Sequence, residues 1–211
     1  MINCLLTGVG GQGILLASKL LATTYMEKEK MVRIADTIGM AQRGGSVVCH
    51  IRAGDIIYSP LIPIKSADIL MGFEPAETVR RLPYLKKDGY IITSTNPINP
   101  SYNSINDYNS LALIDYLENN YTNIVKVDVN SITRECKSSK VINIIIIGVA
   151  IGCNALNISF EDMKDAMKLI IPQKYLAINE YALEIAYSLT SKKKPSTYFT
   201  HYTSSRRNII N

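Results

Sequence analysis

The sequence predicts an α/β fold of three layers, in which helices cover both faces of a mostly parallel β-sheet. Short apolar runs of strand length alternate with runs whose apolar residues recur at helical spacing. A glycine-rich turn joins the first apolar run to the first helical run, and the final part of the chain reads as helix. This order of elements is typical of a Rossmann-like domain followed by C-terminal helices.

The expected strands are short apolar runs bounded by turn residues. They cover residues 2–7, 31–35, 46–52, 67–73, 89–94 and 123–129. The third run alternates between an apolar face and a face that carries His50 and Arg52, which predicts partial exposure and a place near an edge or an interface. Ligands of such sheets gather at the carboxyl ends of the strands, so function is expected in the loops after the first two strands.

The expected helices follow the 3.6-residue apolar spacing. They cover residues 14–25, 74–85, 107–119, 131–153, 161–170 and 174–190. Ser159, with Asp162 three positions later, predicts an N-terminal cap for the fifth helix, and Pro172 separates the last two. Residues 141–150 are apolar on almost every side, which predicts burial, in the core rather than against a partner.

Length and composition indicate one globular domain over residues 1–190 and a basic, flexible tail over 191–211. The composition of 47% hydrophobic and 19% charged residues excludes intrinsic disorder. The net charge of +5 is partly due to lysines and arginines in the tail, so we expect no specific nucleic-acid binding. The longest apolar run, 141–153, is too short to span a bilayer, so we expect a protein without membrane contact.

The cysteines and histidines suggest no metal site. No two of the four cysteines stand at a cluster-binding spacing: Cys4, Cys49, Cys136 and Cys153. Reduced, buried thiols are expected, which places the protein in the cytoplasm. The chain has only two histidines and no nucleophile–base pair of recognisable spacing, so no catalytic residue is assigned.

The turn after the first strand is the first candidate binding motif. It fits GxGxxG and contains Gly8, Gly10, Gly11, Gln12 and Gly13. Backbone amides in such a turn can approach a phosphate, and the following helix N-terminus adds partial positive charge, although a plain tight turn would use the same glycines. Asp36, 23 residues after Gly13, could accept from the ribose of a nicotinamide dinucleotide or could cap the segment 37–42.

The second candidate motif precedes the third strand. It contains Gln42, Arg43, Gly44, Gly45 and Ser46. The guanidinium of Arg43 could bind a carboxylate or a phosphate in a forked geometry. A tight turn with a solvated arginine is the alternative interpretation.

Together the two motifs resemble a known family. GVGGQG at 8–13 followed by GMAQRGGSV at 39–47 is similar to the gamma-type catalytic domain of the 2-oxoacid (pyruvate/ketoisovalerate):ferredoxin oxidoreductases. The stretches 67–75, 83–89 and 172–182 agree, whereas Leu183 and Ala186 stand where the family usually has Phe and Gly. The Met-Ala-Gln before Arg43 is most similar to the indolepyruvate type.

The resemblance implies a subunit that is inactive alone. Enzymes of this family oxidatively decarboxylate a 2-oxoacid with thiamine diphosphate, pass electrons through iron–sulfur clusters to ferredoxin, and transfer the acyl group to coenzyme A. In the indolepyruvate type a larger subunit carries the thiamine diphosphate and the clusters, so this chain need bind no cofactor by itself. We expect both motifs to face that partner, with Arg43 on a substrate carboxylate, a coenzyme A phosphate or a partner carboxylate.

Three alternatives stay open at this point. The chain could be the gamma subunit of an oxidoreductase for another 2-oxoacid, because the partner's pocket sets the substrate. It could be a free-standing NAD(P)-dependent oxidoreductase that uses the GxGxxG turn and Asp36. It could also be a non-enzymatic interaction module built on the same fold.

Overall fold

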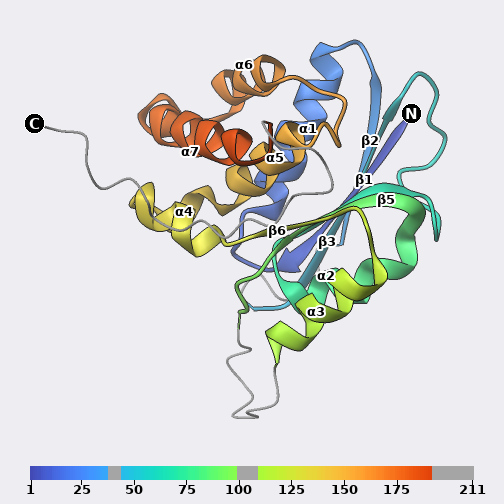
Figure 1. Cartoon of the computed structure of the whole chain (residues 1–211). Helices are drawn as coiled ribbons and strands as arrows, with labels where there is room; N and C mark the ends of the chain where they lie inside the picture. Colours follow the sequence, from blue (N-terminus) through green and yellow to red (C-terminus); the bar gives the residue numbers. More distant parts are fainter. Residues whose placement is uncertain (38–43, 99–108, 192–211) are drawn as a thin grey trace, which may run out of the picture.

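The computed structural model describes residues 1–37, 44–98 and 109–191. A six-stranded sheet lies between two helical layers, which confirms the predicted three-layer α/β class (Figure 1). The strands are β1 (Ile2–Val9), β2 (Met31–Thr37), β3 (Ser46–Gly54), β4 (Ala67–Gly72), β5 (Leu85–Ser94) and β6 (Ile124–Val127). They lie in the order β2-β3-β1-β4-β5-β6.

The sheet is mixed, because one strand runs against the other five. β1, β4, β5 and β6 pair in parallel, whereas β3 is antiparallel to both β1 and β2. The connection between β2 and β3 spans only residues 38–45, which suits antiparallel neighbours, since a parallel crossover needs a dozen or more residues. β3 therefore inserts between β1 and β2, one place inside the sheet edge.

The predicted partial exposure of the second face of β3 is wrong for most of that face. Val48 and His50 are 4% and 6% exposed, and only Arg52 is half-buried. The periodicity of one strand does not show what packs on it. Here the residues that follow β3 and β4 in the chain cover the face.

The helices differ from the predicted ones at two places. They are α1 (Ile14–Glu27), α2 (Pro75–Arg81), α3 (Ser110–Asn120), α4 (Val129–Glu135), α5 (Ile142–Gly152), α6 (Phe160–Ile170) and α7 (Gln173–Ser191). The single helix expected over 131–153 is wrong, because Lys137 has φ 51°, a left-handed conformation that an α-helix cannot contain. The helix expected over 74–85 ends at Arg81, and a 3-10 turn leads into β5.

The cap expected at α6 is confirmed in both directions. The side chain of Ser159 accepts from the backbone N–H of Asp162, and the carboxylate of Asp162 accepts from the N–H of Ser159. At the other end of the helical region, α7 ends at Ser191, so residues 192–211 of the expected tail lie outside the described residues.

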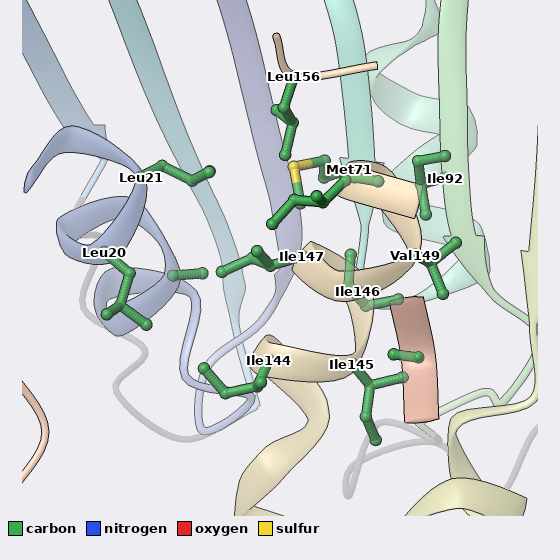
Figure 2. Packing of buried hydrophobic residues seen from close by; sticks show 14 of the residues in the cluster. Leu20, Leu21, Met71, Ile92, Ile144, Ile145, Ile146, Ile147, Val149 and Leu156 are labelled. Atoms are coloured by element: carbon green, nitrogen blue, oxygen red, sulfur yellow. The ribbon is translucent and has the colours of Figure 1, made fainter. Parts of the chain in front are cut away.

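α5 is the centre of the larger core, as its composition predicts. Its four consecutive isoleucines at 144–147 have no exposed surface, and Figure 2 shows them between Leu20 and Leu21 of α1 and Met71 and Ile92 of the sheet. A Cβ added to Gly148 would lie 2.8 Å from the Cβ of Ala186, so α5 and α7 pack closely there.

The connection between β3 and β4, residues 55–66, lies across the amino end of the sheet near the N-terminus (Figure 1). Its far end is tied to the 3-10 turn Leu82–Tyr84, because the N–H of Lys65 donates to the carbonyl of Pro83 over 3.0 Å. We call this segment the β3–β4 connection.

Two side chains of β3 hold the β3–β4 connection in place. The guanidinium of Arg52 donates to the carbonyl oxygens of Ser59 and Leu61 over 2.9 and 3.3 Å. The Nδ1 atom of His50 accepts from the N–H of Ile62 over 3.2 Å, which requires the neutral imidazole.

His50 makes the fold sensitive to acid. Burial lowers its pKa below the ordinary 6.5, the positive charge of Arg81 lowers it further, and Asp36 opposes both effects. Between the folded pKa and 6.5 the unfolded chain therefore binds more protons than the folded protein. Stability contributed by neutral His50 is present above 6.5 and is lost as the pH falls through this window.

We predict that His50→Asn weakens this dependence, since the amide oxygen of asparagine can accept from Ile62 but does not titrate near neutral pH. Urea denaturation at about pH 7.5 and about pH 5.5 measures the unfolding free energy of both proteins. The wild type should lose more stability on acidification than the variant. Equal losses would contradict the role of His50.

Candidate functional site

The two glycine-rich turns meet at the carboxyl end of β1. The backbone N–H of Gly10 donates to the carbonyl of Gly45 over 2.9 Å, and Val9 lies opposite Ser46 in the antiparallel pairing. Gly11 and Gly44 have φ of 104° and 84°, and a Cβ at either would meet nothing within 4 Å. The two turns thus form one continuous rim, which we define as residues 8–13 and 44–46.

Two of the candidate residues, Gln42 and Arg43, lie outside the described residues. The other eight all belong to the rim. Whether any of them binds a ligand is still a prediction.

The side chain of Gln12 holds the rim in shape. It is 8% exposed, its Oε1 atom accepts from the N–H of Val9 over 2.7 Å, and its Nε2 atom donates to the carbonyl of Phe73 over 2.7 Å. A Cβ at Gly8 would lie 2.5 Å from Gln12 Oε1 and 2.7 Å from Phe73 Cβ, so only glycine fits there. Gln12 and Gly8 therefore tie the turn after β1 to the end of β4.

The exposed part of the rim is the start of α1. Gly13 is its N-cap and supplies no side-chain cap, and the first turn contains no acidic residue. Gly11, Gly13 and Leu15 are exposed. Because the first amides of a helix have no partner within the helix and carry partial positive charge, this end can accept a phosphate or carboxylate group.

A polar cluster from α2 joins the rim at Ser46. The Ser46 hydroxyl donates to Glu77 Oε2 over 2.6 Å, while Arg80 pairs with the other oxygen of the same carboxylate. The guanidinium of Arg81 reaches the Ser46 hydroxyl over 3.4 Å, and its Nε atom is buried without a hydrogen-bond partner in the part of the chain that the structure describes.

Sequence reasoning missed this cluster. Its only local signal is the spacing of Glu77, Arg80 and Arg81, which places the three side chains on adjacent positions of one helix face. Charged residues at that spacing more often form an ion pair that is exposed to solvent. Only the packing of α2 against β1 and β4 shows that the face meets the rim.

Asp36 does not take the position that a dinucleotide site requires. β3 separates β2 from β1, so the strand of Asp36 lies two interstrand spacings, about 10 Å, from the strand of the glycine turn. Asp36 lies opposite Cys49 in the pairing, and burial, followed by the Asp36 carboxylate, raises the pKa of that thiol. This placement removes the structural basis of the nicotinamide alternative.

The four cysteines are buried free thiols that come from separate elements, namely β1, β3 and the C-terminal ends of α4 and α5. Burial raises the pKa of Cys4 to about 12, which keeps that thiol protonated and unreactive. Within residues 1–37, 44–98 and 109–191 no three His, Cys, Asp or Glu side chains gather as a metal site would require. No helix in those ranges is long and apolar enough to cross a membrane.

Comparison with known proteins identifies the family. The model of the pyruvate ferredoxin/flavodoxin oxidoreductase family matches residues 3–189. The chain belongs to this family. Among its relatives, indolepyruvate oxidoreductase subunit IorB of Pyrococcus horikoshii is 33% identical over 87% of this chain and 93% of the relative. The subunit of the same name from Archaeoglobus fulgidus is 32% identical over 92% of this chain and 98% of the relative.

Solved structures of ferredoxin oxidoreductases share the fold. The gamma subunit of a keto/oxoacid ferredoxin oxidoreductase from Geobacter sulfurreducens has a TM-score of 0.66 at 17% identity, and covers 89% of this chain and 97% of its own. The 2-oxoglutarate:ferredoxin oxidoreductase from Magnetococcus marinus has a TM-score of 0.69 at 16% identity, and covers 92% of this chain but only 32% of its own. In that enzyme the same fold is one part of a longer polypeptide.

We predict that Gln12→Ala destabilises the protein by about 2–4 kcal/mol, because it leaves the N–H of Val9 and the carbonyl of Phe73 buried without partners. Gln12→Glu is the matched comparison, since it keeps the acceptor for Val9 but sets a carboxylate against the carbonyl of Phe73. Urea denaturation measures both. An unchanged midpoint for both variants would show that the glutamine does not hold the rim.

Proposed function

We propose that this chain is the smaller subunit of an indolepyruvate (arylpyruvate):ferredoxin oxidoreductase. The larger subunit would carry the thiamine diphosphate and the iron–sulfur clusters, and the complex would convert the 2-oxoacid to an acyl-coenzyme A while reducing ferredoxin. One observation carries the proposal: relatives named as indolepyruvate oxidoreductase subunits match this chain at 29–33% identity over 91–98% of their length.

The chemistry of the described residues supports a non-catalytic role for this chain within the complex. The thiols are buried, the imidazole of His50 is engaged by Ile62, and the carboxylate of Glu77 is held by Ser46 and Arg80. When bound in the partner, thiamine diphosphate would supply the electron sink for decarboxylation. This chain would instead position and shield an anionic group at the rim.

The rim fits a phosphate or carboxylate of such a cofactor or substrate. The amides at the start of α1 and the open space beside Gly11 and Gly44 provide donors without side-chain obstruction. Arg43, next to Gly44 in sequence, would add a guanidinium that binds the same anion or a carboxylate of the partner. Four reduced thiols also favour a reducing compartment, the cytoplasm, for the complex.

The proposal predicts activity only from the mixture of both subunits. Purified chain and candidate large subunit are assayed separately and together for ferredoxin or dye reduction with indolepyruvate, phenylpyruvate, pyruvate and 2-oxoglutarate. We expect turnover only with both present, and a preference for the aryl substrates. A preference for pyruvate or 2-oxoglutarate would move the chain to another 2-oxoacid type, and a chain that turns over alone would contradict its role as a dependent subunit.

The proposal also predicts a specific requirement for Arg43. Arg43→Ala should lower turnover or partner affinity by about tenfold or more, because a charge-assisted hydrogen bond contributes about 1.5–3 kcal/mol. Arg43→Lys, which keeps the charge but not the forked donors, should recover part of the loss. Unchanged turnover and unchanged subunit affinity in Arg43→Ala would remove this residue from the site.

A further inference from the structure

The guanidinium of Arg81 lies beside the glycine rim without a carboxylate partner among the described residues. Its Nη2 atom reaches the hydroxyl of Ser46, an exposed residue of the rim, over 3.4 Å. Its Nε atom is buried and has no acceptor in the described part of the chain. A guanidinium has five N–H donors, so the described residues leave most of the donors of this half-buried side chain without an acceptor.

The carboxylate of Glu77 does not pair with this charge directly. It accepts from Ser46 over 2.6 Å and pairs with Arg80 through its other oxygen, so it is linked to Arg81 only through the Ser46 hydroxyl. Burial and then the positive charge of Arg81 lower the pKa of the His50 imidazole, so this charge acts beyond the cluster. Two arginines and one glutamate leave the cluster with an excess of positive charge.

The sequence around the two glycine turns adds no negative charge. Residues 8–13 and 38–45 contain neither Asp nor Glu, and the first turn of α1 contains no acidic residue. The amides at the start of α1 add partial positive charge to the same rim. A partly buried cation in such surroundings is stabilised by an anion that comes from outside the chain.

We propose that Arg81 binds an oxyanion of a substrate of the complex at the Ser46 edge of the rim, either the carboxylate of the 2-oxoacid or a phosphate of coenzyme A. The forked donors of a guanidinium match two oxygens of either group. Glu77 is 4% exposed and directs the Ser46 hydroxyl, and through it the head of Arg81, before the ligand arrives. The inference rests on the proposed function but not on Arg43.

The test measures initial rates of ferredoxin reduction by the reconstituted complex. Phenylpyruvate or coenzyme A is varied while the other is saturating. Arg81→Met keeps the apolar stem of the side chain and removes its charge, so it should raise KM for one of the two substrates about tenfold or more, with kcat unchanged. A higher KM for coenzyme A identifies the phosphate, and a higher KM for phenylpyruvate identifies the carboxylate. Arg81→Lys should recover part of the loss.

Arg134 of α4 offers a matched control. It also stands in the last turn of a seven-residue helix, and its guanidinium donates to the hydroxyl of Ser131 over 3.2 Å. α4 follows β6, which lies at the sheet edge with β4 and β5 between it and β1, so this arginine is away from the rim. Arg134→Met should leave both KM values as in the wild type.

Stability separates a ligand-binding role of Arg81 from a structural one. Arg81→Met should unfold at a urea concentration equal to or above that of the wild type, because it removes a buried N–H that has no acceptor among the described residues. A clearly lower midpoint, or unchanged KM values for both substrates in an active complex, overturns the site and leaves the proposed function intact.

Two further outcomes are decisive. A higher half-saturating concentration of the Arg81→Met subunit, with both KM values unchanged, assigns the guanidinium to a carboxylate of the large subunit and overturns the substrate site. A wild-type complex that turns over no 2-oxoacid refutes the proposed function and this assignment with it.

Discussion

Antiparallel pairing between β1 and β3 places Ser46 opposite Val9, and from this register the hydrogen bond between Gly10 and Gly45 follows. Two glycine turns that lie more than thirty residues apart in sequence thereby become one surface. The same pairing moves β2 to the sheet edge and takes Asp36 away from the turn after β1. One register thus forms the candidate site and removes the dinucleotide alternative.

The polar groups around that site are largely occupied with each other. Gln12 connects the turn to the end of β4, and Glu77 connects α2 to Ser46. The groups that a ligand can still reach are mainly backbone amides, at the start of α1 and beside Gly44. A surface of amides and glycines can position an anion but moves no proton, which is consistent with a subunit that depends on its partner for the reaction.

The sequence predicts the structure correctly where contacts between residues a few positions apart decide it. The capping box of Ser159 and Asp162 involves residues three apart, and the apolar helix α5 follows from its composition. The division of the expected helix 131–153 was missed, although its signal is local: the polar run 137–140 interrupts the apolar pattern, and the Ser138 side chain caps the 3-10 turn that leads into α5. The spacing of Glu77 and Arg80, by contrast, gave no sign that α2 reaches the rim.

The sequence by itself determined the family, the alternation of strands and helices, and the two glycine motifs, because each depends on residue types and on contacts a few positions apart. The tertiary structure alone decided the place of β3, the structural role of the Gln12 side chain, and the hydrogen bonds by which Arg52 and His50 hold the β3–β4 connection. These features depend on contacts between residues far apart in the chain, and such contacts leave no periodicity in the sequence.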